Sequence, residues 1–453
     1  MTEEPITRFV GGPVHAVAAR LADRGVRFVL GTAVDFSGVT RAKGVPIARF
    51  PAFVESGMGA SPSWLVFCAD FGIAFTPDLG VTGDLRLRID PEATTVTDHG
   101  VAWAPAEFFG QDGERFAGCA RWRLRQVVEQ LAAAGLDATT GAELEFVLTE
   151  PGGGVRAGAP WQGYGSRSLL DVAPLFAELT DSFAGAGMPI EQLHAEYGAN
   201  QFEISLAPAD PVTTADRTIL GRILIGRAAA KHGFGVSFSP VPFAGGAGNG
   251  AHLHLSLAEG EVPLFSGGDC AYGLTDRGGA AIAGLVAGLP DVQAVLAGSA
   301  VSPLRLGPGK WSGAFACWGL ENREAAVRLI ADTPGNPHGA SIELKCIDPS
   351  ANPYLAGAAL LGLALDGISG ELPLPPEVTV DPATLPDADK EPLALARTQA
   401  AALDALAASN LARELLGELI VDGTLAVRRY EQRTYGGGAP EDVTAVFRLA
   451  FSC

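Results

Sequence analysis

The chain has 453 residues, 47% of them hydrophobic, which is enough to bury a large core and to form more than one domain. The formal net charge is −19, which we attribute to solubility, and no basic patch offsets it, so a nucleic-acid partner is not expected. The longest apolar run lies near Ala356–Leu365 and is too short to span a bilayer, so no membrane partner is expected either.

The six cysteines are scattered along the chain and form no CxxC pair. A zinc site is therefore not indicated. We expect reduced thiols, and hence a cytoplasmic protein.

The N-terminal part of the chain is predicted to be a small, mainly β unit with one or two helices. Val14–Arg24 has the pattern of an amphipathic helix and ends near Gly25. Two strands are expected at Arg27–Asp35 and Thr40–Pro46, joined by a turn at Gly38. Further short strands are predicted at Trp64–Cys68, Ile73–Thr76, Leu85–Ile89 and Thr94–Thr97.

A junction is expected within Trp103–Glu114, and it divides the chain into an N-terminal domain of residues 1–107 and a larger domain of residues 108–453. In the larger domain, Leu372–Pro392 is rich in proline and aspartate and is predicted to be an exposed linker. Helices are predicted at Cys119–Ala134, Val172–Ala186, Ala215–Lys231, Ala280–Leu289, Leu355–Leu365, Thr398–Leu406 and Leu411–Leu419.

Four short stretches of the larger domain share one layout, in which apolar residues alternate with Glu or His. This alternation is typical of a strand with one buried face. Because the stretches are far apart in the sequence, their polar side chains can meet only if the strands lie side by side in one sheet. The stretches are Gly141–Leu148, Asn200–Leu206, Gly250–Leu257 and Ala340–Asp348.

The polar face of these strands carries side chains that bind hard metal ions. A single pair of them would be an ordinary solvated strand face, because most acids lie in water. Clustered carboxylates on four strands, however, repel one another unless a cation neutralises them. Mg²⁺ and Mn²⁺ favour carboxylate oxygens, and Mn²⁺ tolerates imidazole better, so six ligands can hold two ions. The six are Glu143, Glu145, Glu196, Glu203, His252 and Glu343.

Three arginines complete the predicted site. Arg305 lies in a loop rich in Pro and Gly, and Arg323 and Arg328 lie in the stretch ENREAAVRL. Arginine binds carboxylate and phosphate through paired hydrogen bonds. Two metal ions bridge and neutralise phosphate oxygens in phosphoryl transfer, so this set of residues favours that class of reaction.

Five motifs in this order resemble the glutamine synthetase family: GAELEF, HAEYGANQFEI, GNGAHLHLSL, ENREAAVRL and IELKCIDPSANPYL. The resemblance implies an α+β fold, in which a small N-terminal β-grasp domain precedes a catalytic domain with a curved antiparallel sheet flanked by helices. It also implies a homo-oligomer, commonly a dodecamer of two rings with active sites shared between neighbours. In the implied reaction, ATP phosphorylates the γ-carboxylate of glutamate, and a nitrogen nucleophile then forms the amide.

The resemblance also assigns roles to residues. It implies that Glu145, Glu196 and Glu203 hold the metal ion near glutamate, and that Glu143, His252 and Glu343 hold the ion near the ATP phosphates. Arg305, Arg323 and Arg328 are the expected catalytic arginines. The expected ATP contacts are His254, Arg323 and Arg328, and the expected substrate contacts are Gly248, Arg305, Trp311 and Lys345.

The chain departs from the family where ammonium binds. Glutamine synthetases have an aspartate in a DGSS-type segment, but the matching segment here, Ser56–Ser61, contains no acid. They also have a flap glutamate two residues after a PG pair, and that position is Trp311 here. Lys345 stands where the family usually has arginine, and Ala247 stands roughly where it has asparagine. An acid other than glutamate therefore remains an alternative substrate.

Without the aspartate of the DGSS-type segment and the flap glutamate, an ammonium ion has neither an anchor nor a base in a partly dry site. We therefore predict a primary amine as acceptor and a γ-glutamylamide as product, as in the branch of the family that makes γ-glutamylpolyamines, γ-glutamylethanolamide and γ-glutamylanilide. A cationic amine could bind the indole face of Trp311, or a neutral aromatic amine could stack on it. The alternatives are an ordinary glutamine synthetase that uses ammonia and a non-catalytic structural or regulatory relative.

Overall fold

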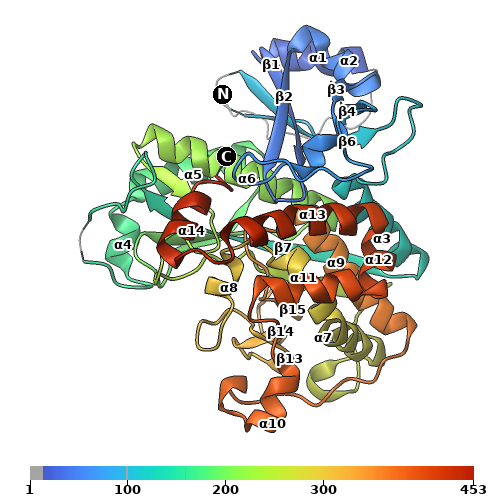
Figure 1. Ribbon diagram of the computed structural model, residues 1–453, viewed down its shortest axis with the longest axis vertical. Coiled ribbons are helices and arrows are strands. Elements are labelled where there is room, and N and C mark those ends of the chain that lie inside the picture. The colour runs from blue at the N-terminus through green and yellow to red at the C-terminus, as the bar shows by residue number, and fades with distance from the viewer. Residues whose placement is uncertain (1–13, 98–99, 159, 453) are drawn as a thin grey trace.

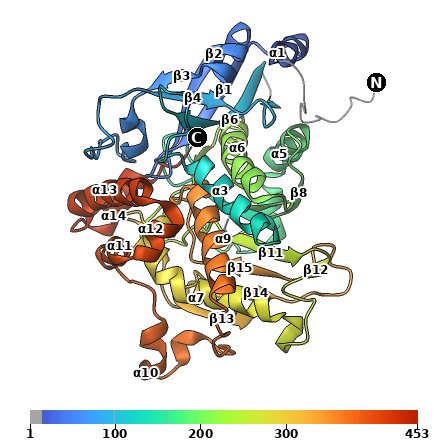
Figure 2. The same ribbon diagram turned by 90° about the vertical axis from the view of Figure 1, so that its right-hand side faces the viewer.

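The computed structural model describes residues 14–97, 100–158 and 160–452. Two β-sheets organise the chain, and the N-terminal sheet lies at the top of the views in Figures 1 and 2. Its strand order is β2–β1–β6–β4–β3, with β5 paired to β6, and only β1 and β6 pair in parallel. The elements are α1 (Val14–Asp23), β1 (Phe28–Val34), β2 (Thr40–Pro46), η1 (Ile47–Arg49), α2 (Phe50–Glu55), β3 (Met58–Ala60), η2 (Pro62–Val66), β4 (Leu85–Ile89), β5 (Thr95–Val96) and β6 (Val101–Phe109).

The predicted first helix and the strands near residues 30, 43, 87 and 95 are confirmed, but two predicted strands are wrong. Trp64–Cys68 overlaps the 3₁₀ helix η2, because the Ser61 hydroxyl accepts the N–H of Ser63 and Pro62 opens a helical turn. Ile73–Thr76 makes one isolated bridge, from Ile73 to Phe67, and no strand. Strand β6 runs through residues 107 and 108 and ends at Phe109, within the predicted junction Trp103–Glu114. The division into domains of residues 1–107 and 108–453 stays a prediction.

The second sheet has the strand order β13–β14–β15–β11–β7–β9–β8, with β10 paired to β7 and β12 paired to β11. The expected antiparallel sheet is confirmed except for β13 and β14, which pair in parallel. Its strands are β7 (Asp137–Thr149), β8 (Ile190–Ala195), β9 (Gln201–Leu206), β10 (Gly235–Ser237), β11 (Leu253–Glu259), β12 (Val262–Pro263), β13 (Phe315–Leu320), β14 (Ala325–Ile330) and β15 (Ser341–Leu344).

Helices cover this sheet, and six of the seven predicted from the sequence are present, several of them longer than expected. The seventh, Leu411–Leu419, is interrupted at Gly417, whose φ of 90° ends one helix before the next begins. The helices with eight residues or more are α3 (Ala120–Ala133), α5 (Ala173–Gly185), α6 (Pro211–Lys231), α7 (Asp276–Leu296), α9 (Pro353–Ser369), α11 (Gln399–Ala408), α13 (Glu418–Tyr435) and α14 (Pro440–Phe447). Shorter ones are α4 (Ser166–Leu170), η3 (Ala271–Gly273), α8 (Ser302–Arg305), η4 (Pro382–Thr384), α10 (Asp387–Lys390), η5 (Glu391–Leu393) and α12 (Asn410–Leu416).

Helices α7 and α9 cross closely in the core below the sheet. A Cβ atom on Gly284 would lie 2.2 Å from the Leu363 carbonyl oxygen and 2.7 Å from the Cα of Gly367, so both glycines are needed at this crossing. Helix α7 is long and apolar enough to cross a membrane, but 78% of its apolar window is buried inside the protein. It is therefore a core helix.

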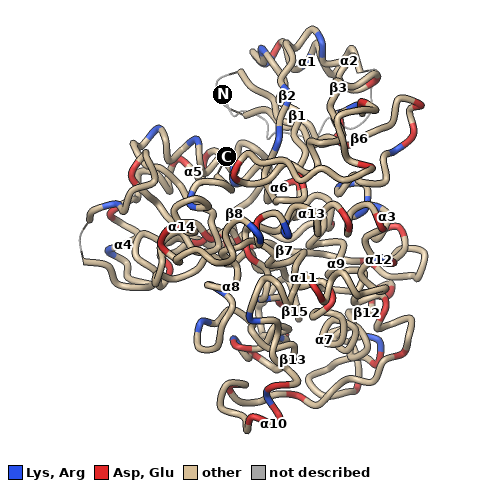
Figure 3. The backbone as a smooth tube through the Cα atoms, in the orientation of Figure 1, with Lys and Arg blue, Asp and Glu red and all other residues tan. Residues whose placement is uncertain are grey.

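The segment Leu372–Pro392, predicted to be an exposed linker, is largely exposed but is attached to the second sheet. It lies along β13, where Trp318 Nε1 donates to the Pro375 carbonyl oxygen at 2.8 Å and Glu377 accepts the N–H of Leu320 at 2.9 Å. The second bond pairs a backbone N–H of β13, an edge strand whose outer backbone groups would otherwise lack a partner strand. Figure 3 shows acidic positions spread over all parts of the fold, in agreement with acidity as a source of solubility.

Candidate active site

The four strands predicted to carry metal ligands are neighbours in the second sheet, in the order β15–β11–β7–β9. The register then decides which side chains meet. His254 of β11 is opposite Glu343 of β15, and Glu145 of β7 is opposite Glu203 of β9. Directly opposed residues of an antiparallel pair point to the same face, so the sheet gathers these side chains as the sequence predicts.

The ligand-type side chains form three clusters, in each of which the candidate ligand atoms lie within 4.8 Å of one another. The first cluster is Glu143, His252 and Glu343. Nδ1 of His252 is 2.8 Å from Glu143 Oε2 and 3.5 Å from Glu343 Oε1. His254 Nε2 is 3.1 Å from the other oxygen of Glu143. These contacts place the three residues expected to hold the ion near ATP in one group.

The second cluster is Glu145, Glu203 and again His252. Glu145 Oε2 accepts the N–H of Gly250 at 2.9 Å and the side-chain amide of Gln201 at 3.1 Å. A Cβ atom on Gly250 would lie 2.5 Å from His252 Nε2 and 2.7 Å from Glu145 Oε1. Only glycine at this position leaves the two ligands in place.

The third cluster is His194, Glu196 and Glu203. His194 lies at the end of β8 opposite Glu203, and its Nε2 is 2.8 Å from Glu196 Oε1. The Tyr164 ring stacks on the His194 ring with centroids 5.9 Å apart. The cluster differs from the expected set, which joins Glu196 and Glu203 to Glu145. That expected grouping around one ion stays a prediction.

The sequence reasoning missed His194 and Gln201, although a signal for both is present. Each lies two residues before a predicted ligand, as HAE and QFE, which is the same spacing as in GAELEF and AHLHL. On a strand, this spacing places both side chains on one face. Gln201 also donates to the Gly248 carbonyl oxygen at 2.8 Å and therefore ties the glycine-rich loop to Glu145.

Burial and mutual repulsion perturb the carboxylates of the clusters. Burial, together with the charges of Glu143, Glu145 and Glu196, raises the pKa of Glu203 well above its ordinary value. Burial also acts to raise the pKa of Glu143, but hydrogen bonds from His252 and His254 lower it well below its usual range. A divalent cation would relieve the repulsion at Glu203, so the donor set fits a hard metal ion.

The predicted arginines and Lys345 take different positions around the clusters. Arg305 is buried, with Nη2 3.1 Å from His252 Nε2, and its Nη1 has no hydrogen-bond partner among the described residues. Arg328 Nη1 donates to Glu343 Oε2 at 3.0 Å, and Lys345 Nζ donates to Glu343 Oε1 at 2.9 Å. Arg323 is exposed, and its charge acts on the hydroxyl of Tyr164.

Gly248 and Trp311 are the remaining residues of the predicted substrate site. A Cβ atom on Gly248 would lie 2.7 Å from Cγ of Arg305, so this glycine lets the loop pass against the arginine. Trp311 is 52% exposed and has a backbone φ of 51°. Its N–H donates to Glu324 Oε1 at 2.8 Å. Glu324 is a further residue that the sequence reasoning missed.

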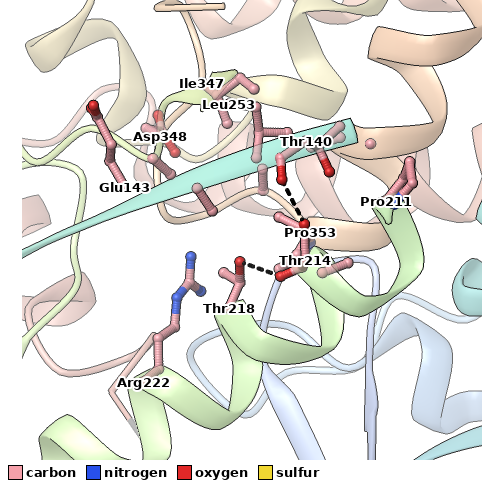
Figure 4. A pocket seen from close by; sticks show the side chains of 16 residues that line it. Thr140, Glu143, Pro211, Thr214, Thr218, Arg222, Leu253, Ile347, Asp348 and Pro353 are labelled. Atoms are coloured by element: carbon pink, nitrogen blue, oxygen red, sulfur yellow. Dashed lines mark hydrogen bonds between the residues drawn. The ribbon is translucent and has the colours of Figure 1, made fainter. Parts of the chain in front are cut away.

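A cavity of about 30 Å³ lies behind the sheet, between β7 and helices α6 and α9 (Figure 4). It is lined by Thr140, Thr214, Thr218, Asp348 and Pro353, among others. That volume has room for about one water molecule. The cavity is therefore not the substrate site, and the chemistry belongs to the opposite face of the sheet.

The chain belongs to the glutamine synthetase family and is an ATP-dependent ligase, because residues 117–443 match the family described as glutamine synthetase, catalytic domain. It is 36% identical over 447 residues to gamma-glutamylpolyamine synthetase GlnA3 of Streptomyces coelicolor, an alignment that covers 96% of each chain. A novel glutamine synthase homolog has a similar structure, with a TM-score of 0.83, 29% identity and coverage of 94% of this chain and 98% of the other. The GmaS/ADP complex matches with a TM-score of 0.82, 27% identity and coverage of 93% and 97%.

Proposed function

We propose that this ligase joins the γ-carboxylate of glutamate to a primary amine. A carboxylate oxygen attacks the γ-phosphorus of ATP and ADP leaves; the amine nitrogen then attacks the acyl carbon, phosphate leaves, and the nitrogen loses a proton. The observation that carries the choice of an amine over ammonia is the half-exposed indole of Trp311, at the flap position where glutamine synthetases have an acid. The relation to a γ-glutamylpolyamine synthetase supports this choice.

The geometry supports distinct roles for the clusters. The first and third clusters would hold Mg²⁺ or Mn²⁺, two or more ions per site, and a bound ion neutralises phosphate and carboxylate charge. Arg305, with a buried donor that lacks a partner, would bind the glutamate carboxylate. Arg323, Arg328 and His254 would contact the phosphates of ATP, and Gly248 and Lys345 would border glutamate.

A cationic amine fits the surroundings better than a neutral aromatic one. Glu324, whose carboxylate accepts the N–H of Trp311 at 2.8 Å, places a negative charge beside the flap. Trp311 is half-exposed, and the face of its indole attracts an ammonium group. A diamine or polyamine, with a second cationic group, matches both features.

We further propose that the N-terminal unit is a β-grasp domain, and that subunits assemble into a dodecamer of two rings in a cytoplasm. Phe71, Phe75 and Val81 are exposed apolar side chains on one N-terminal loop, and they support a contact between subunits.

The test is amide formation with glutamate, ATP and Mn²⁺ or Mg²⁺, in the presence of ammonium, ethanolamine, putrescine or aniline. We expect the highest kcat/KM with putrescine, together with a product whose mass is that of γ-glutamylputrescine. Highest activity with ammonium would identify an ordinary glutamine synthetase. The absence of metal-dependent ATP hydrolysis under all conditions would identify a non-catalytic relative.

A further inference from the structure

The flap that carries Trp311 is a tight turn with a strained backbone. Trp311 has a φ of 51°, a left-handed conformation that is unfavourable for a bulky residue. Ser312 closes the turn, because its hydroxyl donates to the Gly307 carbonyl oxygen at 3.2 Å and accepts the N–H of Gly307 at 3.1 Å. Such a conformation persists only where the surroundings hold it, and it occurs preferentially in ligand clamps.

Glu324 is the side chain that holds this conformation from outside the turn. It lies directly before β14, is 6% exposed, and accepts the N–H of Trp311 at 2.8 Å through Oε1. The Asn322 side chain in turn accepts the N–H of Glu324 at 3.1 Å, so the residue is itself fixed.

The position of Glu324 is costly for stability. Its Oε2 is buried and has no hydrogen-bond partner among the described residues. A buried acceptor without a donor has lost its hydrogen bonds to water and gained none in the protein. Burial also raises the pKa of Glu324. A carboxylate kept in such a position is more consistent with a role in the site than with a contribution to stability.

We propose that Glu324 is a positioning residue for acceptor selectivity: its carboxylate holds the flap so that the Trp311 indole forms one wall of the amine site. This inference rests on the proposed function. It attributes the selection of the amine to Trp311 on the flap and to Glu324, which lies directly before β14. The indole contacts the amine, and Glu324 acts through the indole.

The experiment compares Glu324→Gln with the unaltered chain in amide synthesis with putrescine and with ammonium. We expect KM for putrescine to rise about tenfold, because a charge-assisted hydrogen bond to the flap is weakened. KM for ATP should not change, and the preference for putrescine over ammonium should fall. The melting temperature should stay the same or rise, since a buried charge has been removed.

The matched control is Glu377→Gln, because Glu377 also accepts a backbone N–H, that of Leu320 at 2.9 Å, but on the edge strand β13. It should leave KM for putrescine unchanged. Unchanged amine kinetics in Glu324→Gln, or equal shifts in both variants, would overturn the inference. If Glu324→Gln does not fold, Glu324→Asp, which keeps the charge but has a shorter reach, must raise KM for putrescine, and no change would again overturn it.

Fluorescence separates this inference from the proposed function. The component of tryptophan emission that disappears in Trp311→Phe reports on the flap. Acrylamide should quench that component more strongly in Glu324→Gln than in the unaltered chain, whether or not any amine is a substrate. Equal quenching would overturn the role of Glu324, whereas failure to form any amide would overturn only the proposed function.

Discussion

At the scale of single residues, the sequence could predict ligands but not every partner. Five of the six metal-type side chains lie in stretches with one period-two pattern and can be read from spacing, whereas Glu196 lies outside these stretches. His194 and Gln201 follow the same spacing, but they were missed because His-x-Glu and Gln-x-Glu are common on solvated strands. Glu324 could not be predicted, because its partner is a backbone N–H of a loop whose fold is not encoded locally.

Glu203 gives a prediction at this scale. Because burial and three neighbouring carboxylates raise its pKa, Glu203→Gln should stabilise the metal-free protein. The same change should weaken Mn²⁺ binding roughly tenfold to a hundredfold, since a shared ligand is lost. Melting temperatures with and without Mn²⁺ measure both effects.

The control for this prediction is Glu191→Gln, an exposed glutamate on β8. It should leave both melting temperatures unchanged. A metal-free Glu203→Gln variant that is less stable than the unaltered chain would contradict the repulsion argument.

At the scale of elements, strands with a strong pattern were predicted well, and weakly patterned ones were not. The four ligand strands were expected to be neighbours, and β15, β11, β7 and β9 are. The strand at Trp64–Cys68 was wrong because the cap at Ser61 selects a helical turn, which outweighs a short apolar run. Leu372–Pro392 has a loop-like composition, and its attachment to β13 depends on side chains from a distant strand.

Gly284 gives the prediction for the elements. Gly284→Ala should destabilise the protein by about 1–3 kcal/mol, because the new methyl group would meet the backbone of α9. Urea unfolding measures this change. Gly279→Ala on the same helix is the control, since its Cβ meets only Leu374, at an ordinary contact distance of 3.4 Å. The control should be neutral or stabilising, and equal losses in both variants would contradict the packing argument.

At the scale of the whole molecule, two buried arginines join the N-terminal sheet to the helices that follow it in the chain. Arg121 of α3 binds Asp90 and Glu107 on the N-terminal side and Asp216 of α6, each at 2.9 Å. Arg428 of α13 donates to the Ser37 carbonyl oxygen and to Glu431. Neither network could be predicted, because the partners are separated by up to several hundred residues.

Glu431 makes the second network sensitive to pH. Burial raises its pKa from the ordinary 4.5 to about 7, against the opposing charge of Arg428. The folded state therefore binds this proton more tightly than the unfolded state, and stability falls as pH rises from about 4.5 to about 7, by at most about 3 kcal/mol. Glu431→Gln should remove this slope, which urea unfolding at about pH 5 and about pH 7 measures. Parallel changes in the variant and the unaltered chain would contradict the assignment.

The three clusters overlap, and this limits how many ions they can accommodate at once. His252 belongs to the first and second clusters, and Glu203 belongs to the second and third. Nδ1 of His252 faces Glu143, Glu145 and Glu343 alike, and a ring nitrogen has one lone pair to give. An ion bound by the second cluster would thus take His252 from the first cluster. It would also compete for Glu203 with an ion bound by the third cluster. Under the proposed function, this overlap favours a pair of ions on the first and third clusters, because an ion in the second cluster would have to share His252 and Glu203 with its neighbours.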